Sequence, residues 1–154
     1  NIGQKKSNAI RSERFFEGIR AIDAFTRMRP ASLEAEAINR AIAIAEVAGC
    51  PIYIPHISVA RGLDPVVQAK RRGQEVYAET CPQYLFFTVD DLRREDGAKW
   101  ICSPPVRTSE DNARLWQGLA DGTLQTIGTD HCPFFYDGSQ PILYEGESVR
   151  IAGK

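Results

Sequence analysis

Several features are absent from this 154-residue sequence, and each absence excludes a class of protein. No apolar run approaches the roughly 18 residues that a membrane-spanning helix needs, and the N-terminal stretch lacks the apolar core of a signal peptide. Neither sign of charge is in excess, because 19 Lys and Arg face 20 Asp and Glu, so the basic footprint of a nucleic-acid-binding protein is missing. The sequence also has no glycine-rich phosphate loop, G-x-S-x-G motif or H-E-x-x-H motif. With 43% hydrophobic residues, the composition is that of a globular domain.

The cysteines are few and dispersed, with no C-x-x-C pair among Cys50, Cys81, Cys102 and Cys132. A disulfide framework is typical of shorter secreted chains, so we expect buried thiols in a cytoplasmic protein. The sequence begins at Asn1 rather than Met, which indicates a piece of something longer.

Helical and strand patterns alternate along the chain, with no internal repeat. Ser32 and Ser109 are the predicted N-caps of two of the helices, and Pro55 counts against the first strand because proline lacks the ladder N–H. The predicted helices cover 9–25, 33–48, 60–72, 89–94 and a segment from 109 to 121, and the predicted strands cover 51–57, 75–79 and 124–129.

This alternation predicts βαβ units and a parallel sheet, and therefore an α/β fold. A doubly wound sheet and a (β/α)8 barrel both satisfy the pattern. A complete barrel needs about 250 residues, so this chain can supply only three or four of its eight strands. In either architecture the functional groups are expected at the carboxyl ends of the strands.

Polar residues follow each predicted strand. His56 ends the first, Glu79 ends the second, and Asp130 and His131 follow the last. A neutral imidazole at such a place can bind a metal, although a hydrogen-bonded core histidine is commoner at this position. From position alone, Asp130 fits a metal ligand, a general base or the cap of the next element. His131 and Cys132 are adjacent, and adjacent strand residues point to opposite faces, so a catalytic Cys–His pair is not favoured there.

Four blocks at these strand ends occur in a specific order: residues 53–58 read YIPHIS, 79–85 ETCPQYL, 102–107 CSPPVR and 128–134 GTDHCPF. Over about residues 29–136, this series resembles the dihydropyrimidinase/hydantoinase branch of the cyclic amidohydrolases. Allantoinases and dihydroorotases are more distant, because Gln83, Ser103 and the block after the last strand fit this branch better.

The resemblance implies the C-terminal portion, about strands 6–8, of a (β/α)8 TIM-type barrel that is incomplete in this chain. It implies a two-metal site, usually zinc, and commonly a homotetramer. His56 matches a metal-ligand histidine, Asp130 matches an aspartate that binds metal and shuttles the proton, and Ser103 matches a serine whose main chain holds the cyclic amide. The implied reaction opens a dihydropyrimidine or hydantoin ring to give an N-carbamoyl amino acid.

The resemblance stops at both ends of the chain, so residues 1–28 form an unassigned helical segment and residues 137–154 a second unassigned segment. The branch's H-x-H pair, carboxylated lysine and strand-five histidine have no counterpart here, and Pro55 stands where an aliphatic residue is usual. We therefore expect the chain alone to be inactive or nearly so. The expected partners are a small cyclic amide or ureide and either further copies or the missing barrel portion, with no nucleic acid and no membrane.

Three alternatives remain open at this point. The chain could derive from a non-catalytic, dihydropyrimidinase-like scaffold protein, although retention of both His56 and Asp130 argues against that. It could derive from an allantoinase-type amidohydrolase. It could also be a truncated or rearranged product, which is compatible with any of these functions.

Overall fold

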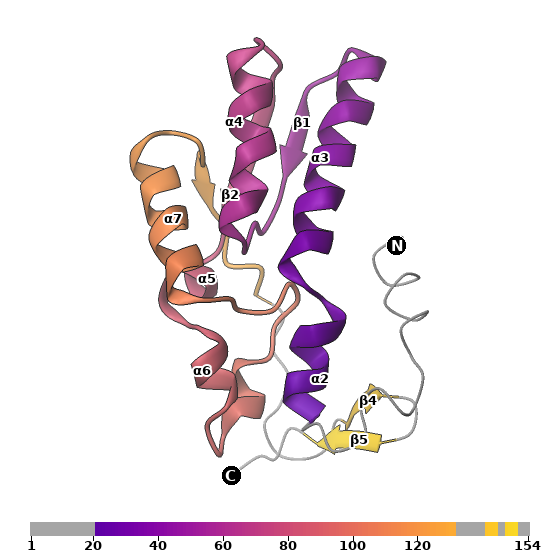
Figure 1. Cartoon of the computed structure of the whole chain (residues 1–154), viewed down its shortest axis with the longest axis vertical. Coiled ribbons are helices and arrows are strands. Elements are labelled where there is room, and N and C mark those ends of the chain that lie inside the picture. Colours follow the sequence, from indigo (N-terminus) through magenta and orange to yellow (C-terminus); the bar gives the residue numbers. More distant parts are fainter. Residues whose placement is uncertain (1–20, 132–140, 145–146, 151–154) are drawn as a thin grey trace.

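The structure is a computed structural model that describes residues 21–131, 141–144 and 147–150. Figure 1 shows the order of the elements along the chain. In sequence order they are α2 (Ala21–Met28), α3 (Ala31–Ala48), β1 (Ile52–Ile54), η2 (Ala60–Gly62), α4 (Leu63–Arg71), β2 (Val76–Thr80), α5 (Pro82–Phe86), α6 (Val89–Leu92), η3 (Gly97–Trp100), α7 (Ser109–Ala120), β3 (Thr126–Ile127), β4 (Pro141–Tyr144) and β5 (Glu147–Arg150).

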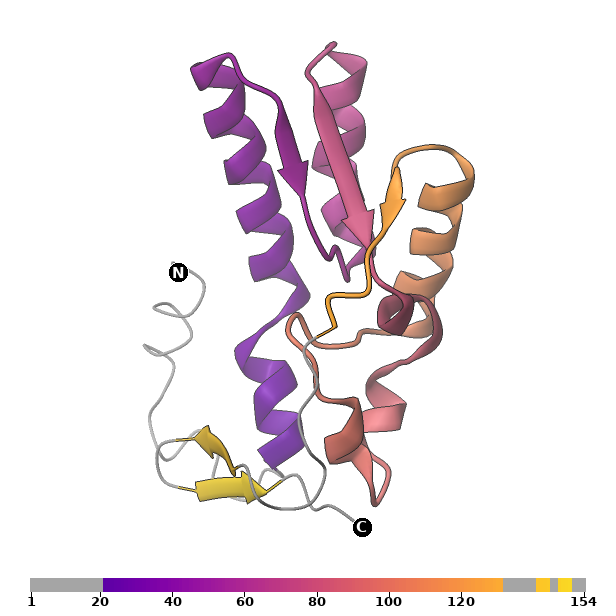
Figure 2. The same ribbon diagram turned by 180° about the vertical axis from the view of Figure 1, so that it is seen from behind.

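The predicted parallel sheet is present, with three strands in the order β1-β2-β3. Ile52 pairs with Val76, and Thr80 pairs with Ile127, so both neighbours of the central strand run parallel to it. Figures 1 and 2 show α3, α4 and α7 on one face of this sheet, with the three strand arrows pointing to the same end of the molecule. The α/β class predicted from the sequence is confirmed. A separate antiparallel pair is formed by β4 and β5.

The hydrophobic core lies between the sheet and these helices. Every second residue of β2 is buried, beginning with Val76, because alternate side chains of a strand point to opposite faces. The helices bury Ile42, Leu63 and Leu115 against that face. The helices that connect parallel strands lie against the sheet, and here they bury this face.

The opposite face of the sheet carries no helix in the described part of the chain, as Figure 2 shows from behind. Tyr53 and Tyr77 remain about half exposed there, at 48% and 49% of their surface. Tyr53 and Tyr77 are direct register partners on β1 and β2. The sheet therefore has one packed face and one face rich in uncovered aromatic surface.

Both serine N-caps predicted from the sequence are wrong. Pro30 occupies the N-cap of α3, and Thr108 occupies that of α7, where its side chain and Asp111 form a reciprocal capping box. Ser32 lies one position inside α3, while the left-handed Gly49 (φ 64°) ends that helix as the pattern predicts. A threonine followed by an acidic residue three positions later is a stronger cap signal than a lone serine.

Other differences concern element boundaries. The first predicted strand shortens to β1, which ends before Pro55, and the last shortens to β3. Helix α5 was not predicted, because its five residues are too few to show periodicity. The prediction of buried thiols is confirmed for Cys81 and wrong for Cys50, which is exposed, whereas Cys102 is only partly buried. Cys132 lies outside the described residues. Residues 9–20 of the first predicted helix also lie outside them. No described helix is long and apolar enough to span a membrane.

A core truncation measures how much the helix-covered face contributes to stability. Leu63 is fully buried on α4, so Leu63→Ala is expected to lower the free energy of unfolding by about 2–5 kcal/mol, because it removes buried methyl groups and leaves a cavity. Val47→Ala is the matched control, since Val47 is 91% exposed on α3, and its effect should stay within about 0.5 kcal/mol. Urea unfolding followed by circular dichroism measures both, and equal losses would contradict this placement of the core.

Candidate functional site

His56 lies two residues beyond the end of β1, in a backbone conformation that few residues other than glycine adopt. Its φ is 45°, in the left-handed region, and its side chain is half-buried. The next residue is held on both sides by β2: the Ile57 N–H donates to the Glu79 carbonyl at 2.8 Å, and the Thr80 hydroxyl donates to the Ile57 carbonyl at 2.7 Å. The fixed backbone at Ile57 thus maintains the unusual conformation of His56.

Asp130 occupies the corresponding place beyond β3. Its φ is 46°, and its side chain is exposed. Among the described residues, His56 and Asp130 are the only non-glycine positions with a positive φ. Such conformations cost free energy and cluster at functional sites, where surrounding structure maintains them. The structure therefore brings the two predicted ligand positions to the same end of the sheet, on either side of β2, and gives them the same rare backbone conformation.

Glu79 lies between these two turns, at the end of the central strand. Its carboxylate accepts a hydrogen bond from the Tyr53 hydroxyl at 2.7 Å and a longer one from the His56 N–H at 3.4 Å. A Cβ atom added to Gly128 would overlap this carboxylate, so the side chain of Glu79 lies directly against the backbone two residues before Asp130. Glu79 therefore contacts the strand ends that carry both predicted ligands.

Sequence reasoning placed Glu79 at a strand end but gave it no role. The signal was available, because Glu79 occupies the same face of β2 as Tyr77, opposite to the buried positions. A carboxylate on that face can accept hydrogen bonds from neighbouring strands, and here it accepts one from the Tyr53 hydroxyl. Which donors it finds depends on the register of the sheet, and the sequence alone does not show it.

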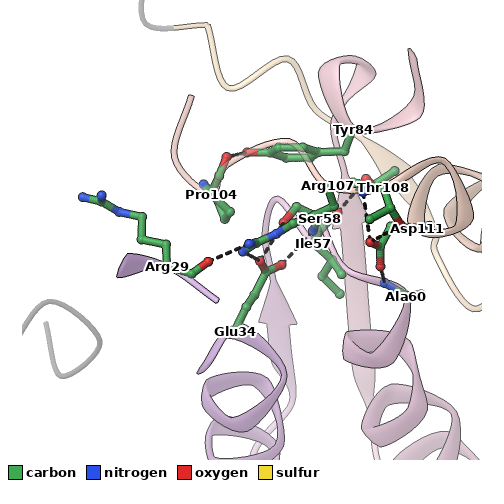
Figure 3. Close-up of polar contacts among 11 residues, drawn as sticks. Arg29, Glu34, Ile57, Ser58, Ala60, Tyr84, Pro104, Arg107, Thr108 and Asp111 are labelled. Atoms are coloured by element: carbon green, nitrogen blue, oxygen red, sulfur yellow. Dashed lines mark hydrogen bonds and ion pairs between the residues drawn. The ribbon is translucent and has the colours of Figure 1, made fainter. Parts of the chain in front are cut away.

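Ser103, the predicted substrate-binding residue, is exposed in the segment between η3 and α7, and its peptide bond to Pro104 is cis. The next carbonyl, that of Pro104, accepts a hydrogen bond from the Tyr84 hydroxyl at 2.9 Å. Burial raises the pKa of Tyr84 far above its usual value, so this phenol stays protonated and remains a donor. Figure 3 shows Tyr84 and Pro104 next to the segment that follows His56.

Two thiols add to the same region of the fold. Burial, followed by the charge of Glu79, raises the pKa of Cys81 to about 12, and burial raises the pKa of Cys102 to about 11. The charge of Asp130 raises the pKa of both thiols as well. Both are therefore neutral near pH 7, and neither is suited to act as a nucleophile or as a thiolate ligand.

The described residues do not by themselves fit the two-metal site that the resemblance implies. Nowhere in residues 21–131 do three or more His, Cys, Asp and Glu side chains converge as a metal site would require. The whole sequence contains only two histidines, and His131 is exposed beside Asp130. Binuclear hydrolytic sites need several ligands and a bridging group, so this chain holds at most part of such a site.

Known proteins with similar sequences and structures are hydantoinases and dihydropyrimidinases. No family model matches the chain. It is 47% identical over 126 residues to a D-hydantoinase of Streptomyces coelicolor, covering 80% of this chain and 27% of that protein. It is 46% identical over 112 residues to a D-hydantoinase of Rhizobium radiobacter, covering 71% and 24%.

Solved structures agree with the sequence matches. The D-hydantoinase from Bacillus sp. AR9 superposes with a TM-score of 0.80 at 38% identity, covering 86% of this chain and 29% of that one. The dihydropyrimidinase from Brevibacillus agri NCHU1002 gives 0.77 at 39% identity, covering 82% and 28%. Over most of its length the chain is therefore similar to part of the hydantoinases and dihydropyrimidinases, the branch that its sequence motifs predict. The chain spans about a quarter of the length of these relatives.

The contact between Glu79 and Gly128 can be tested by a mutant cycle. Gly128→Ala is expected to destabilise the chain by about 0.5–1.5 kcal/mol, because the new methyl group displaces the Glu79 carboxylate from its hydrogen bond with the Tyr53 hydroxyl. In the Glu79→Ala background the same substitution should cost clearly less, since the overlapping atoms are gone. Thermal unfolding of the four proteins measures the coupling, and strictly additive losses would show that the two residues do not touch.

The raised thiol pKa values predict selective alkylation. At pH 8 the thiolate fraction of Cys102 is only about one thousandth and that of Cys81 is lower, so iodoacetamide should label the exposed Cys50 far faster than either. Peptide mass mapping of the native chain gives the separate rates. Labelling in denaturant is the control, where the three rates should converge. Equal rates in the native chain would contradict the burial of Cys81 and the partial burial of Cys102.

Proposed function

We propose that this chain is the part of a cyclic-amide hydrolase that contains about strands 6–8 of a (β/α)8 barrel. The proposal depends on where His56 and Asp130 lie. Both residues have a left-handed backbone conformation and follow the strands on either side of β2, at the carboxyl end of a parallel sheet. Catalytic groups of barrel enzymes are presented from this end. The 47% identity to a D-hydantoinase supplies the reaction class, which is hydrolysis of a dihydropyrimidine or hydantoin ring.

Each proposed site residue has a role that fits its place. The exposed carboxylate of Asp130 takes a proton from the attacking water and delivers it to the departing ring nitrogen. The main chain at Ser103 holds the cyclic amide, in a segment anchored by the bond from Tyr84 to the next carbonyl. His56 and Asp130 contribute two of the ligands of a zinc site that is completed by groups outside this chain.

A shortage of ligands makes the isolated chain inactive in this proposal. With two histidines in all, and one of them adjacent to Asp130 on the exposed segment, it cannot surround two metal ions. Within the described residues, β1 and β3 each have one outer edge without a paired strand, and Tyr53 and Tyr77 lie on an uncovered face. In this proposal the remaining strands of the barrel, or another copy of the chain, cover these surfaces.

The first test uses the chain alone. Purified chain with added zinc is expected to open neither dihydrouracil nor hydantoin above the rate of buffer, measured by the formation of the N-carbamoyl product. Turnover that Asp130→Ala abolishes would contradict the proposed inactivity and show that the two ligands suffice.

A chimaera tests the proposed site roles. When residues 31–131 replace the matched segment of the Streptomyces coelicolor D-hydantoinase, the chimaera should hydrolyse hydantoins. Asp130→Asn in the chimaera should then lower kcat by a factor of about 10² or more, because proton transfer is lost. Glu75→Gln is the control, since Glu75 is exposed directly before β2, at the opposite end of the sheet from the site, and the kcat of this variant should stay within about twofold of the unmodified chimaera. A folded but inactive chimaera would instead favour descent from a non-catalytic scaffold protein.

A further inference from the structure

Arg107 is a buried cation with three hydrogen-bond acceptors in three different segments. Its side chain is only 9% exposed. The guanidinium donates to the Arg29 carbonyl at 2.6 Å, to the Glu34 carboxylate at 2.9 Å and to the Ser58 hydroxyl at 3.1 Å. Figure 3 shows these contacts converging on Arg107 from α3, from the chain before α3 and from the segment after β1. The planar, forked donor set of arginine is suited to hold several acceptors in one fixed geometry.

Glu34 completes the arrangement from the first turn of α3, with its side chain 13% exposed. Its two oxygens accept hydrogen bonds from the Ser58 N–H at 2.7 Å and from the Ser58 hydroxyl at 2.6 Å. The Ser58 hydroxyl thus donates to Glu34 while it accepts from Arg107. Every charged group here has its counter-charge and its hydrogen-bond partners, which is the condition under which buried charges are tolerated.

The segments held by this pair lead directly to two proposed site residues. Ser58 lies two residues after His56, and Arg107 lies four residues after Ser103. The segment after His56 has a further anchor, because the Ala60 N–H donates to Asp111 of α7 at 2.7 Å. The left-handed turn at His56 is therefore followed by a backbone tied to β2, α3 and α7 in succession.

We propose that Glu34 and Arg107 are positioning residues: their buried ion pair fixes the turn that carries His56 against the segment that carries Ser103. This inference rests on the proposed function for the roles of His56 and Ser103, while the coupling of the two segments is a property of the chain itself. Neither residue reaches the exposed end of the site, and both act through Ser58 and through the backbone.

A variant that retains the positive charge tests positioning most directly. Arg107→Lys can still face Glu34, but a single ammonium cannot replace the forked contacts to Ser58 and the Arg29 carbonyl. The exposed pair Arg72–Glu46, with side chains 49% and 51% exposed, supplies the matched control Arg72→Lys. Both variants are made in the full 154-residue chain, and neither measurement below needs a metal or a substrate.

The first readout is amide hydrogen exchange. In Arg107→Lys, exchange of the Ser58 amide should rise by about tenfold or more, while the amide of Leu115 inside α7 changes by less than about twofold. Arg72→Lys should change neither. If Ser58 and Leu115 accelerate by the same factor, the pair contributes only to overall stability, and the proposal is overturned.

The second readout is the NMR spectrum of the two imidazoles, in which His131 is an internal reference. The ring signals of His56 should shift or broaden in Arg107→Lys, and those of His131 should not. A purely stabilising role leaves the His56 signals of the folded variant in place, and that result would overturn the proposal.

A second variant covers the case in which Arg107→Lys does not fold. Glu34→Gln with Arg107→Met removes both charges together and leaves an amide oxygen to accept from the Ser58 N–H, so no buried charge is stranded. The same local change at Ser58 and His56 is expected, and unchanged His56 signals in this folded double variant would overturn the proposal. An inactive chimaera would refute the proposed function and leave these two measurements intact, which keeps the two failures distinguishable.

Discussion

The ion pair between Glu34 and Arg107 is the constraint on which the arrangement of the proposed site depends. The two residues are 73 positions apart, and Ser58, which both contact, lies between them in sequence. The pair is largely buried, at 9% and 13% exposed, so the loss of one partner would leave the other charge without its counter-charge. One buried cation thereby relates the start of α3, the turn after β1 and the approach to α7.

The sheet adds a second constraint of a different kind. The helix-covered face of the sheet is stabilised by hydrophobic burial. On the opposite face, side-chain hydrogen bonds link the strands: the hydroxyls of Tyr53 and Thr126 lie 2.8 Å apart, and the Tyr53 hydroxyl also donates to Glu79. This small polar chain crosses all three strands close to their carboxyl ends. It links β1 and β3, the strands that lead to His56 and Asp130, across the central strand β2.

Much of the fold could be predicted from local pattern. The long helix α3, the helix α7 and the strand β2 all lie within a few residues of their predicted positions, because apolar periodicity and acidic first turns are properties of short windows. The strand lengths and the two N-caps were wrong, since pairing partners and capping boxes decide them. The short helix α5 has no periodicity to detect.

The proposed site also contains residues that the sequence predicts and residues that only the structure identifies. His56, Ser103 and Asp130 could be predicted because they stand in quotable motifs at strand ends. Glu79 and Arg107 could not be assigned roles, because what distinguishes them is a contact across 26 or 49 positions of sequence. The close approach of the Glu79 carboxylate to Gly128 is likewise visible only in the folded chain.

The backbone at His56 also limits which amino acids can occupy this position, whatever its chemistry. At a φ of 45°, branched residues such as valine, isoleucine and threonine are strongly disfavoured, whereas glycine, asparagine and aspartate are accepted. In a saturation library selected only for a folded chain, this codon would therefore retain small polar residues and lose aliphatic ones. Sequence variation at position 56 would then report the shape of the turn as well as any demand for an imidazole.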